Sequence, residues 1–388
     1  MEQPIQPSER MFQDLPAALV EEALARTHQI GQEVSAALQR IRIQRETYRQ
    51  QLQERRLIQR DGEVPYAPIP TTCGVDGAYA IERLLATDLV AAAAVAVEGL
   101  SPPSEQRYWE QPQHQVIIEA EPHSAESQLL VRACMMAMEL SLAVRAPHEV
   151  VFLDGSLTTP LIYFNEALTA LARGLPPLAL SGHLLGQIES ALDCYQQILR
   201  SERSDKHWVA APKYTTRREI GSLLDWPPAY DDRGMLTTVL LPGELTLPQP
   251  LQPPEQEWHL NLNALPSPLK ERAQRLYQAV VAALQQIAVL YYRPFSWLPA
   301  LRIEVSSSIA RNPERLALVI QALRHQCGTP SILEPYPLYL ADRMVKSLAS
   351  GIAAFRQLTS QQIAEQSQGE MLSEIFLALH GYRTDTGR

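Results

Sequence analysis

Three carboxylate side chains carry the most specific chemical signal in the sequence. Asp76 ends an apolar stretch in CGVDGAYA, and Asp154 ends another in VVFLDGS. Glu139 lies between them in VRACMMAMELSLAV, and its neighbours three and four positions away are apolar: Met135, Met136, Leu142 and Ala143. Helical spacing therefore puts this carboxylate on the apolar face of a helix. Carboxylate oxygens suit Mg²⁺ or Mn²⁺, so the three acids predict a divalent metal site.

Simpler explanations of the same residues stay open. An Asp-Gly pair is common in turns that bind nothing. A buried carboxylate needs a cation or a hydrogen-bond donor, and for Glu139 this partner could be Arg132, two turns earlier on the same side of the helix.

The order of elements around the acids indicates the fold class. The pattern predicts strands over 71–80, 85–100 and 114–121, a helix over 124–144 and a buried strand over 149–156. Acids on the first strand, the helix and the fourth strand are typical of RNase H-like nucleases. There, two divalent ions about 3.5–4 Å apart cleave a phosphodiester. We expect an α/β protein with an RNase H-like mixed β-sheet flanked by helices, an N-terminal helical extension and inserted helices.

The remaining pattern alternates between helices and short strands. Expected helices cover residues 160–174, 183–201, 215–224, 268–290, 312–326 and 337–356. Expected strands cover 207–211, 235–242, 257–262 and 302–306, with a loop over 243–256, and the last 25 or so residues are helical in pattern.

The N-terminal part differs from the rest in charge. Residues 15–58 predict one or two long helices, and the second half carries seven arginines against two glutamates between positions 40 and 60, a local charge of +5. This is either a solvated helix face or a contact for phosphate or an acidic partner. We expect three parts: an N-terminal helical, Arg-rich segment (1–63), the nuclease-like domain (64–356) and a C-terminal helical segment with a polar tail (357–388).

Composition excludes several classes of protein. The 388 residues carry a net charge of −9, which argues against coating nucleic acid by bulk charge. The four cysteines form no CxxC pair, and there is no HExxH, Walker A or GxGxxG motif. The longest apolar run, 89–97, is far shorter than the ~20 residues of a membrane span, so we expect a cytoplasmic protein with no membrane contact.

Six pieces of sequence, in this order and spacing, carry a family resemblance. They are VDGAYA (75–80), the Glu139 helix followed by VVFLDGSL (150–157), PKYTTRREI (212–220), DDRGMLTTVLLPGE (231–244), RIEV (302–305) and PYPLYLADRMVKSL (335–348). Together they resemble the NurA family of DNA-end-resection nucleases over about residues 70–350.

The resemblance implies roles for the acids. Asp76 and Asp154 match two aspartates that bind manganese in the family, and Glu139 matches the glutamate between them, so these three are the expected catalytic and metal-binding residues. Asp342 stands where relatives usually carry a histidine near the metals, and is the expected fourth ligand. Ala78 replaces a serine that many relatives have.

Three further residues match positions that the resemblance connects with substrate. Lys213 follows a strand and is expected to meet a phosphate, Arg302 belongs to an RIE element with Glu304, and Tyr336 opens the late helix. Ordinary explanations stay open: a solvated basic face for Lys213, a surface pair for Arg302 and Glu304, and a helix-surface charge for Asp342.

The resemblance implies a Mn²⁺-dependent deoxyribonuclease, with Mg²⁺ as the alternative ion. Its expected activity is 5′-to-3′ resection of DNA ends in double-strand break repair, with single-strand endonuclease activity as an option. The expected partners are DNA, a second copy of the chain and a hexameric HerA-type translocase ATPase. One alternative is a non-catalytic subunit of the translocase, because the histidine is missing. Another is an actin-like sugar kinase or phosphatase, but the Gly-rich phosphate loops of those folds are absent.

Overall fold

A single mixed β-sheet organises the protein. The computed structural model describes residues 15–84, 87–103, 105–174 and 178–366. Within them the sheet order is β1-β7-β9-β10-β6-β5-β2-β3-β4, and β8 pairs with β9. The strands are β1 (Ile58–Arg60), β2 (Thr72–Arg83), β3 (Asp88–Glu98), β4 (Gln113–Glu121), β5 (Val150–Leu153), β6 (His207–Ala210), β7 (Glu244–Thr246), β8 (Gln249–Pro250), β9 (Ile287–Arg293) and β10 (Leu301–Ser306).

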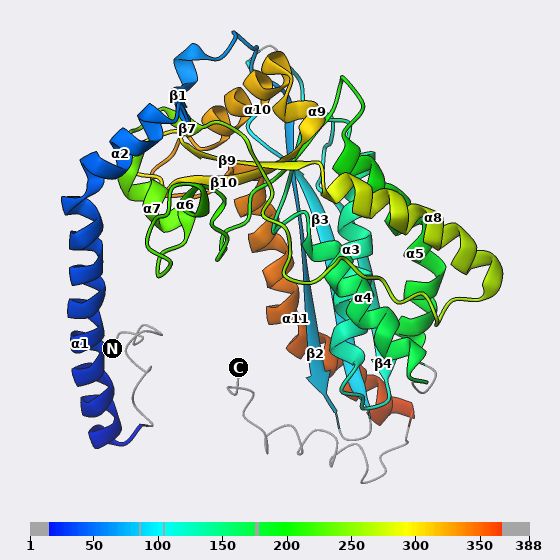
Figure 1. Cartoon of the computed structure of the whole chain (residues 1–388). Coiled ribbons are helices and arrows are strands. Elements are labelled where there is room, and N and C mark those ends of the chain that lie inside the picture. The colour runs from blue at the N-terminus through cyan, green and yellow to red at the C-terminus, as the bar shows by residue number, and fades with distance from the viewer. Residues whose placement is uncertain (1–14, 85–86, 104, 175–177, 367–388) are drawn as a thin grey trace.

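Helices cover both faces of the sheet (Figure 1). They are α1 (Ala17–Ile43), α2 (Arg45–Glu54), α3 (Ser127–Arg145), α4 (Thr159–Ala172), α5 (Ala179–Arg200), α6 (Glu219–Leu223), α7 (Asp232–Val239), α8 (Ser267–Leu284), α9 (Ser307–Ala310), α10 (Pro313–Gln326) and α11 (Tyr336–Gln366). Both α3 and α11 pack on β2 and β3. A Cβ at Gly74 would meet α11 and one at Gly77 would meet α3, so these helices lie on opposite faces of β2.

The central strands confirm the RNase H-like fold. Strands β2, β3 and β4 form an antiparallel meander, whereas β5 runs parallel to β2 and β6 runs parallel to β5. The alanine run of β3, residues 91–94, is buried between helices on both faces. Small side chains there let α3 and α11 approach the sheet closely, which explains why this strand resembles a helix in composition.

The segment before the central domain confirms the expected long helices. Helix α1 stands apart from the body in Figure 1 and exposes Leu19, Leu24, Ile30 and Val34. Helix α2 buries Tyr48 and Leu52 and packs near α7. Strand β1 then joins the sheet beside β7. The expected domain bounds stay a prediction: β1 belongs to the common sheet, and α11 continues without a break through residue 357. The polar tail lies outside the described residues.

Four element predictions were wrong. The loop expected over 243–256 contains the short strands β7 and β8. Residues 232–239 form α7 rather than a strand, because the Asp231 side chain caps the helix by accepting a hydrogen bond from Gly234 N. Residues 257–262 form no strand; Leu260 and Leu262 are buried from an extended loop. The helix expected to reach 290 ends at Leu284, and the β-branched and aromatic stretch that follows is β9.

Helix α3 is long and apolar enough to cross a membrane by length and composition. In the fold, however, 72% of that window is buried inside the protein. Its contacts with β2, β3, α4 and α5 account for the apolar composition as that of a core helix.

The closest approach of α11 to the sheet requires a glycine at position 74. An added Cβ would lie 2.6 Å from the backbone nitrogen of Leu338, and backbone cannot rotate away. We expect Gly74→Ala to destabilise the fold by about 1–3 kcal/mol, measured by denaturant unfolding.

The matched control is Gly182→Ala, at an exposed position of α5 where an added Cβ meets nothing within 4 Å. This change should stabilise the protein by up to about 1 kcal/mol through helix propensity. Equal stability of the two variants would contradict the close approach of α11.

Candidate metal site

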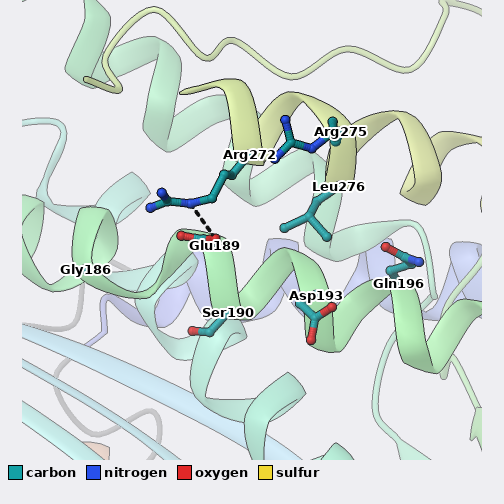
Figure 2. Close-up of a pocket in the computed structure, with 8 residues that line it drawn as sticks. All are labelled: Gly186, Glu189, Ser190, Asp193, Gln196, Arg272, Arg275 and Leu276. Atoms are coloured by element: carbon teal, nitrogen blue, oxygen red, sulfur yellow. Dashed lines mark ion pairs between the residues drawn. The ribbon is translucent and has the colours of Figure 1, made fainter. Parts of the chain in front are cut away.

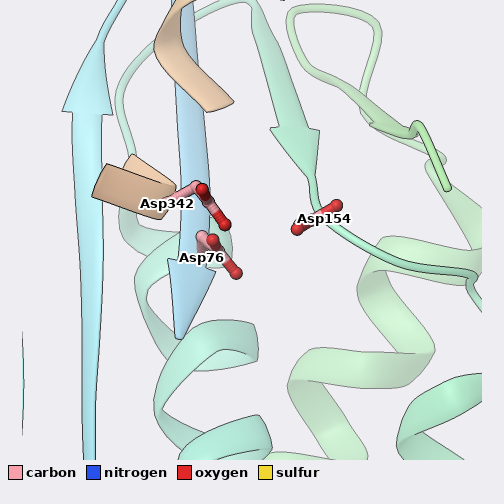
Figure 3. A group of neighbouring side chains, drawn as sticks. All are labelled: Asp76, Asp154 and Asp342. Atoms are coloured by element: carbon pink, nitrogen blue, oxygen red, sulfur yellow. The ribbon is translucent and has the colours of Figure 1, made fainter. Parts of the chain in front are cut away.

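Three aspartates from distant parts of the chain meet at one edge of the central strands. Asp76 lies on β2, Asp154 directly follows β5, and Asp342 lies on α11 (Figure 3). One carboxylate oxygen from each lies within 4.8 Å of the other two. The parallel register of β2 and β5 pairs Val75 with Leu153, which brings the two following aspartates to the same level. The contact of α11 with Gly74 brings Asp342 to the same place.

Glu139 approaches the group from the opposite face of β2. Its side chain is buried, and the missing side chain of Gly77 makes room for its carboxylate. The alternative partner Arg132 instead pairs with Glu166 at 2.8 Å. Burial, followed by the negative charges of Asp76 and Asp154, raises the pKa of Glu139 well above its usual value. In the described part of the chain no donor or cation reaches this carboxylate, so its charged form requires a cation beside Asp76.

Lys213 is the cation that contacts three carboxylates around the site. Its Nζ lies 3.2 Å from Asp154 Oδ2, 3.2 Å from Glu334 Oε2 and 3.5 Å from Asp342 Oδ1. Burial lowers the pKa of the ammonium, but the charges of these three acids outweigh burial and raise it above its usual value. Lys213 is therefore an ion-paired cation within the site rather than part of a solvated face.

Glu334 is a carboxylate of this site that sequence reasoning missed. It lies two residues before α11, next to the PYP piece, and its side chain is 18% exposed. Burial raises its pKa, although the positive charge of Lys213 opposes the shift. Its position directly before the helix that carries Asp342 was the available signal.

The aspartates differ in how strongly they hold a proton. Burial, then the charge of Asp154, raises the pKa of Asp76 to about 7. Asp342 is different: burial acts against ionisation, but the hydrogen bond from Lys346 at 2.8 Å and the charge of Lys213 lower its pKa. Asp342 therefore stays ionised inside the cluster, and its side chain is only 17% exposed. The alternative of a helix-surface charge therefore does not describe Asp342.

The donor set fits divalent metal ions. Asp76, Glu139, Asp154 and Asp342 offer only carboxylate oxygens, the ligands that Mg²⁺ and Mn²⁺ prefer. The buried Glu139 has no counter-ion in the described part of the chain, and the two lysines that pair with the cluster, Lys213 and Lys346, cannot neutralise all the remaining acids. Added cations would relieve both deficits.

Arg302 lies in a buried network instead of at the surface. Its side chain is 1% exposed and donates to both carboxylate oxygens of Glu219, at 2.6 and 2.9 Å, to Glu304 Oε1 at 2.9 Å and to the Tyr291 hydroxyl at 2.7 Å. The expectation that Arg302 contacts substrate does not fit this burial, because four of its five N–H groups already donate to buried partners. The alternative of a surface pair is also wrong, because Arg302 and Glu304 form their ion pair in the core.

This network holds the loop that carries Asp154. The second oxygen of Glu304 accepts hydrogen bonds from the backbone nitrogen of Leu157 and the hydroxyl of Ser156, both at 2.8 Å. Glu219, the other partner of Arg302, begins α6, which follows the segment of Lys213. Arg302 thus ties together the two segments that place Asp154 and Lys213.

A pocket of about 520 Å³ opens between these same two segments. Ser156 and Thr158 line one side, and Tyr214 and Arg217 line the other. Tyr214 is 93% exposed and was not singled out from the sequence. Tyr336 lies elsewhere, as the partly exposed first residue of α11, and its role toward substrate stays a prediction.

Another pocket, of about 600 Å³, lies between α5 and α8 (Figure 2). Arg272 pairs there with Glu189 at 2.7 Å, and Arg275 and Asp193 add one charge of each sign. It shares no element with the carboxylate cluster, and its mixed charges are typical of a polar surface.

Comparison with known proteins identifies the fold. No protein-family model matches the chain, and no curated protein matches its sequence. The crystal structure of the NurA nuclease from Sulfolobus solfataricus matches with a TM-score of 0.56 and 14% identity, over 91% of this chain and 98% of that one. NurA with manganese (TM-score 0.48, 14% identity, 76% and 90% covered) and NurA bound to dAMP and manganese (0.47, 14%, 82% and 93%) also match. The chain therefore has a NurA-like fold.

The raised pKa of Asp76 predicts how stability depends on pH. The folded protein holds this proton up to about pH 7, whereas an unfolded aspartate releases it near pH 4. The stabilisation is therefore complete below about pH 4 and is lost as the pH rises through 7. In EDTA we expect Asp76→Asn to be more stable than wild type at pH 8, by on the order of 2 kcal/mol, and not at pH 4.

Melting temperatures across this pH range would measure the effect, with the exposed Asp193→Asn as control. An Asp76→Asn curve parallel to that of wild type would show that Asp76 titrates normally.

The Arg302 network predicts a large cost for removing its cation. Arg302→Ala leaves Glu219 and Glu304 buried without a counter-charge, and we expect a loss of about 3–5 kcal/mol in unfolding free energy. The matched control Arg203→Ala removes an exposed pair with Asp205 and should cost at most about 1 kcal/mol. Urea unfolding measures both losses. Similar losses for the two variants would show that the Arg302 network does not hold these segments together.

Proposed function

We propose that this protein is a metal-dependent deoxyribonuclease that hydrolyses phosphodiester bonds, with Mn²⁺ as the preferred ion and Mg²⁺ as the alternative. One observation carries the proposal: Asp76, Asp154 and Asp342 gather where β5 ends beside β2, and the buried Glu139 lies behind them on the other face of β2. Too little positive charge lies there to balance these acids. The motif resemblance to NurA nucleases supports the same conclusion.

The four acids would hold the metal from two sides. Asp76, Asp154 and Asp342 bring their carboxylate oxygens together on one side, and Glu139 approaches from the other face of β2. Divalent ions in such a site polarise the scissile phosphate and lower the pKa of the attacking water. Because Asp76 and Glu139 hold protons when no cation balances them, both must lose these protons as the site is loaded.

Lys213 has a second task in this proposal. Its ammonium is paired with three carboxylates at the edge of the cluster. When cations neutralise Asp154 and Asp342, the ammonium is free to donate to a phosphate oxygen while Glu334 still holds it. The neighbouring pocket then receives the adjoining nucleotide: the exposed ring of Tyr214 suits a base, and Arg217 suits the next phosphate.

We extend the proposal to the biological setting that the resemblance implies. The activity would be 5′-to-3′ resection of DNA ends in double-strand break repair, by a homodimer that works with a hexameric HerA-type translocase. A net charge of −9 gives the nuclease no long-range attraction for DNA. A translocase that delivers the DNA makes such attraction unnecessary, so the charge is compatible with this partnership. We also propose a cytoplasmic location, where such a nuclease would meet chromosomal DNA ends.

The position of Asp342 bears on the alternative of a non-catalytic subunit. That alternative rests on the loss of a histidine, but the carboxylate that replaces it lies in the acid cluster and offers an oxygen ligand. The substitution therefore favours a retuned metal site over an inactive one.

A cleavage assay tests the proposal. Labelled single- and double-stranded DNA would be incubated with Mn²⁺, Mg²⁺ or EDTA, with and without a HerA-type ATPase. We expect cleavage with Mn²⁺, none with EDTA, and a loss of at least about 100-fold for Asp154→Asn, because one ligand of the reacting centre is removed. The control Asp193→Asn, which changes an exposed aspartate of α5, should keep full activity.

Cleavage that survives in Asp154→Asn would place the activity elsewhere. No cleavage under any condition, together with no stabilisation by Mn²⁺ and intact binding to the translocase, would support the non-catalytic subunit. Faster DNA cleavage in the presence of the ATPase would support the partnership. If the two proteins formed no complex, the proposed partnership would be wrong.

A further inference from the structure

A second concentration of charge, positive this time, lies where the N-terminal helices meet the body. Arg42 and Arg45 stand at the junction of α1 and α2, and Arg293 ends β9. They line one pocket of about 510 Å³ together with Thr237 and Thr238 of α7. No acidic side chain lines this pocket. It shares no residue with the carboxylate cluster.

The arginines of this pocket differ from their neighbour Arg49. One turn along α2, Arg49 makes a two-pronged ion pair with Glu244, with 2.7 and 2.5 Å between the paired atoms. In the part of the chain that the structure describes, no carboxylate lies within 4.0 Å of the guanidinium of Arg42, Arg45 or Arg293. The basic segment thus contains one arginine used for internal pairing and a group that is left without counter-ions.

Arg293 is held rigidly in this arrangement. Its guanidinium donates to the backbone carbonyls of Leu298, Leu240 and Ser296, at 3.2, 2.8 and 3.1 Å. These bonds fix its orientation but leave its charge unbalanced, and two of its five N–H groups stay free. Burial and the nearby charge of Arg45 lower the pKa of Arg293, which shows that the two cations repel one another.

Arg45 adds a donor without an acceptor. Its Nε is buried, and no hydrogen-bond partner reaches it. The guanidinium is therefore not satisfied inside the protein, and because Arg45 lines the pocket, its terminal nitrogens would meet an external acceptor there. Arg42 is exposed at the rim, where it can turn toward a ligand.

These observations select an anion with several oxygens. Guanidinium groups match phosphate oxygens in pairs, and three of them around one site neutralise a multiply charged group. We propose that this pocket, formed by Arg42, Arg45 and Arg293, binds a phosphate group. The phosphate comes either from a nucleic-acid backbone or from a free phosphate ion; only the first source rests on the proposed function.

For a nuclease, the pocket would hold a backbone phosphate of the substrate away from the acids. The carboxylate cluster repels DNA until cations fill it, whereas this pocket attracts phosphate without metal. One phosphate contact supplies modest affinity, which agrees with a chain whose net charge is −9.

The experiment uses the full chain in EDTA, so that the carboxylate site takes no part. Melting temperatures are measured against sodium phosphate, with sodium chloride at equal ionic strength as reference, for wild type, Arg45→Gln, Arg42→Gln and Arg26→Gln. Arg26 lies on the exposed face of α1 and controls for the loss of one charge. Anisotropy of a labelled single-stranded oligonucleotide measures backbone binding by the same proteins.

We expect a phosphate-specific rise in melting temperature for wild type and Arg26→Gln, and an apparent Kd about tenfold weaker for Arg45→Gln and Arg42→Gln. Weaker oligonucleotide binding in the same two variants identifies the backbone as the source; unchanged oligonucleotide binding identifies a free phosphate. If Arg45→Gln does not fold, Arg42→Gln at the exposed rim decides.

The proposal is overturned if wild type responds equally to phosphate and chloride, or if both pocket variants respond as wild type does. Neither result depends on cleavage. A protein that binds phosphate here but cuts no DNA would refute the proposed function and leave this phosphate site standing. A protein that cuts DNA but binds no phosphate here would refute the site and leave the proposed function standing.

Discussion

Mutual repulsion of carboxylates is the constraint on which the structure depends. Like charges this close raise each other's pKa values and push the chain segments that carry them apart. Rigid elements must therefore hold them: the parallel register of β2 and β5 fixes Asp76 beside Asp154, and the contact at Gly74 fixes α11 with Asp342. Both the strand register and the contact at Gly74 are made by backbone atoms. Repulsion between carboxylates cannot move these atoms as easily as it moves a flexible side chain. The site is costly without cations, and that cost is the driving force for binding them.

The positive charges divide into those that support the site and those that act in it. Arg302 is fully buried and donates four of its five N–H groups to buried partners, so it positions the segments around it. Lys213 keeps 28% of its side chain exposed and shares its charge among three acids, so it can exchange partners when the site is loaded. The difference follows from chemistry. A guanidinium satisfies two carboxylates at fixed angles, whereas an ammonium is a point charge on a flexible stem.

The sequence predicted the part of the site that local patterns determine. Asp154 directly follows β5 as expected, whereas Asp76 lies inside β2, which continues to Arg83 instead of turning at Gly77. The order of strands and helix around the two aspartates is nevertheless enough to predict an RNase H-like sheet. Glu334 escaped notice because its role depends on a contact with Lys213, more than a hundred residues away, and its position before α11 was the one local signal. Arg302 was misplaced for the same reason: on a strand, alternation cannot tell a surface pair from a buried one when both faces of the sheet are covered. Strand β9 was absorbed into the preceding helix because its apolar residues continue the run of α8.

Charge is separated within this molecule, and the separation bears on how an acidic protein would handle DNA. The net charge of −9 is an average over an acidic cluster at the centre of the sheet and a group of arginines at the junction of α1, α2 and α7. Screening in physiological salt limits the reach of each to about 8 Å, so a phosphate near one is influenced little by the other. The acids would then repel backbone phosphates only locally, and only until metal ions neutralise them. If both proposals hold, substrate binding and metal loading would be separate events on separate surfaces, and the overall charge would not set their order.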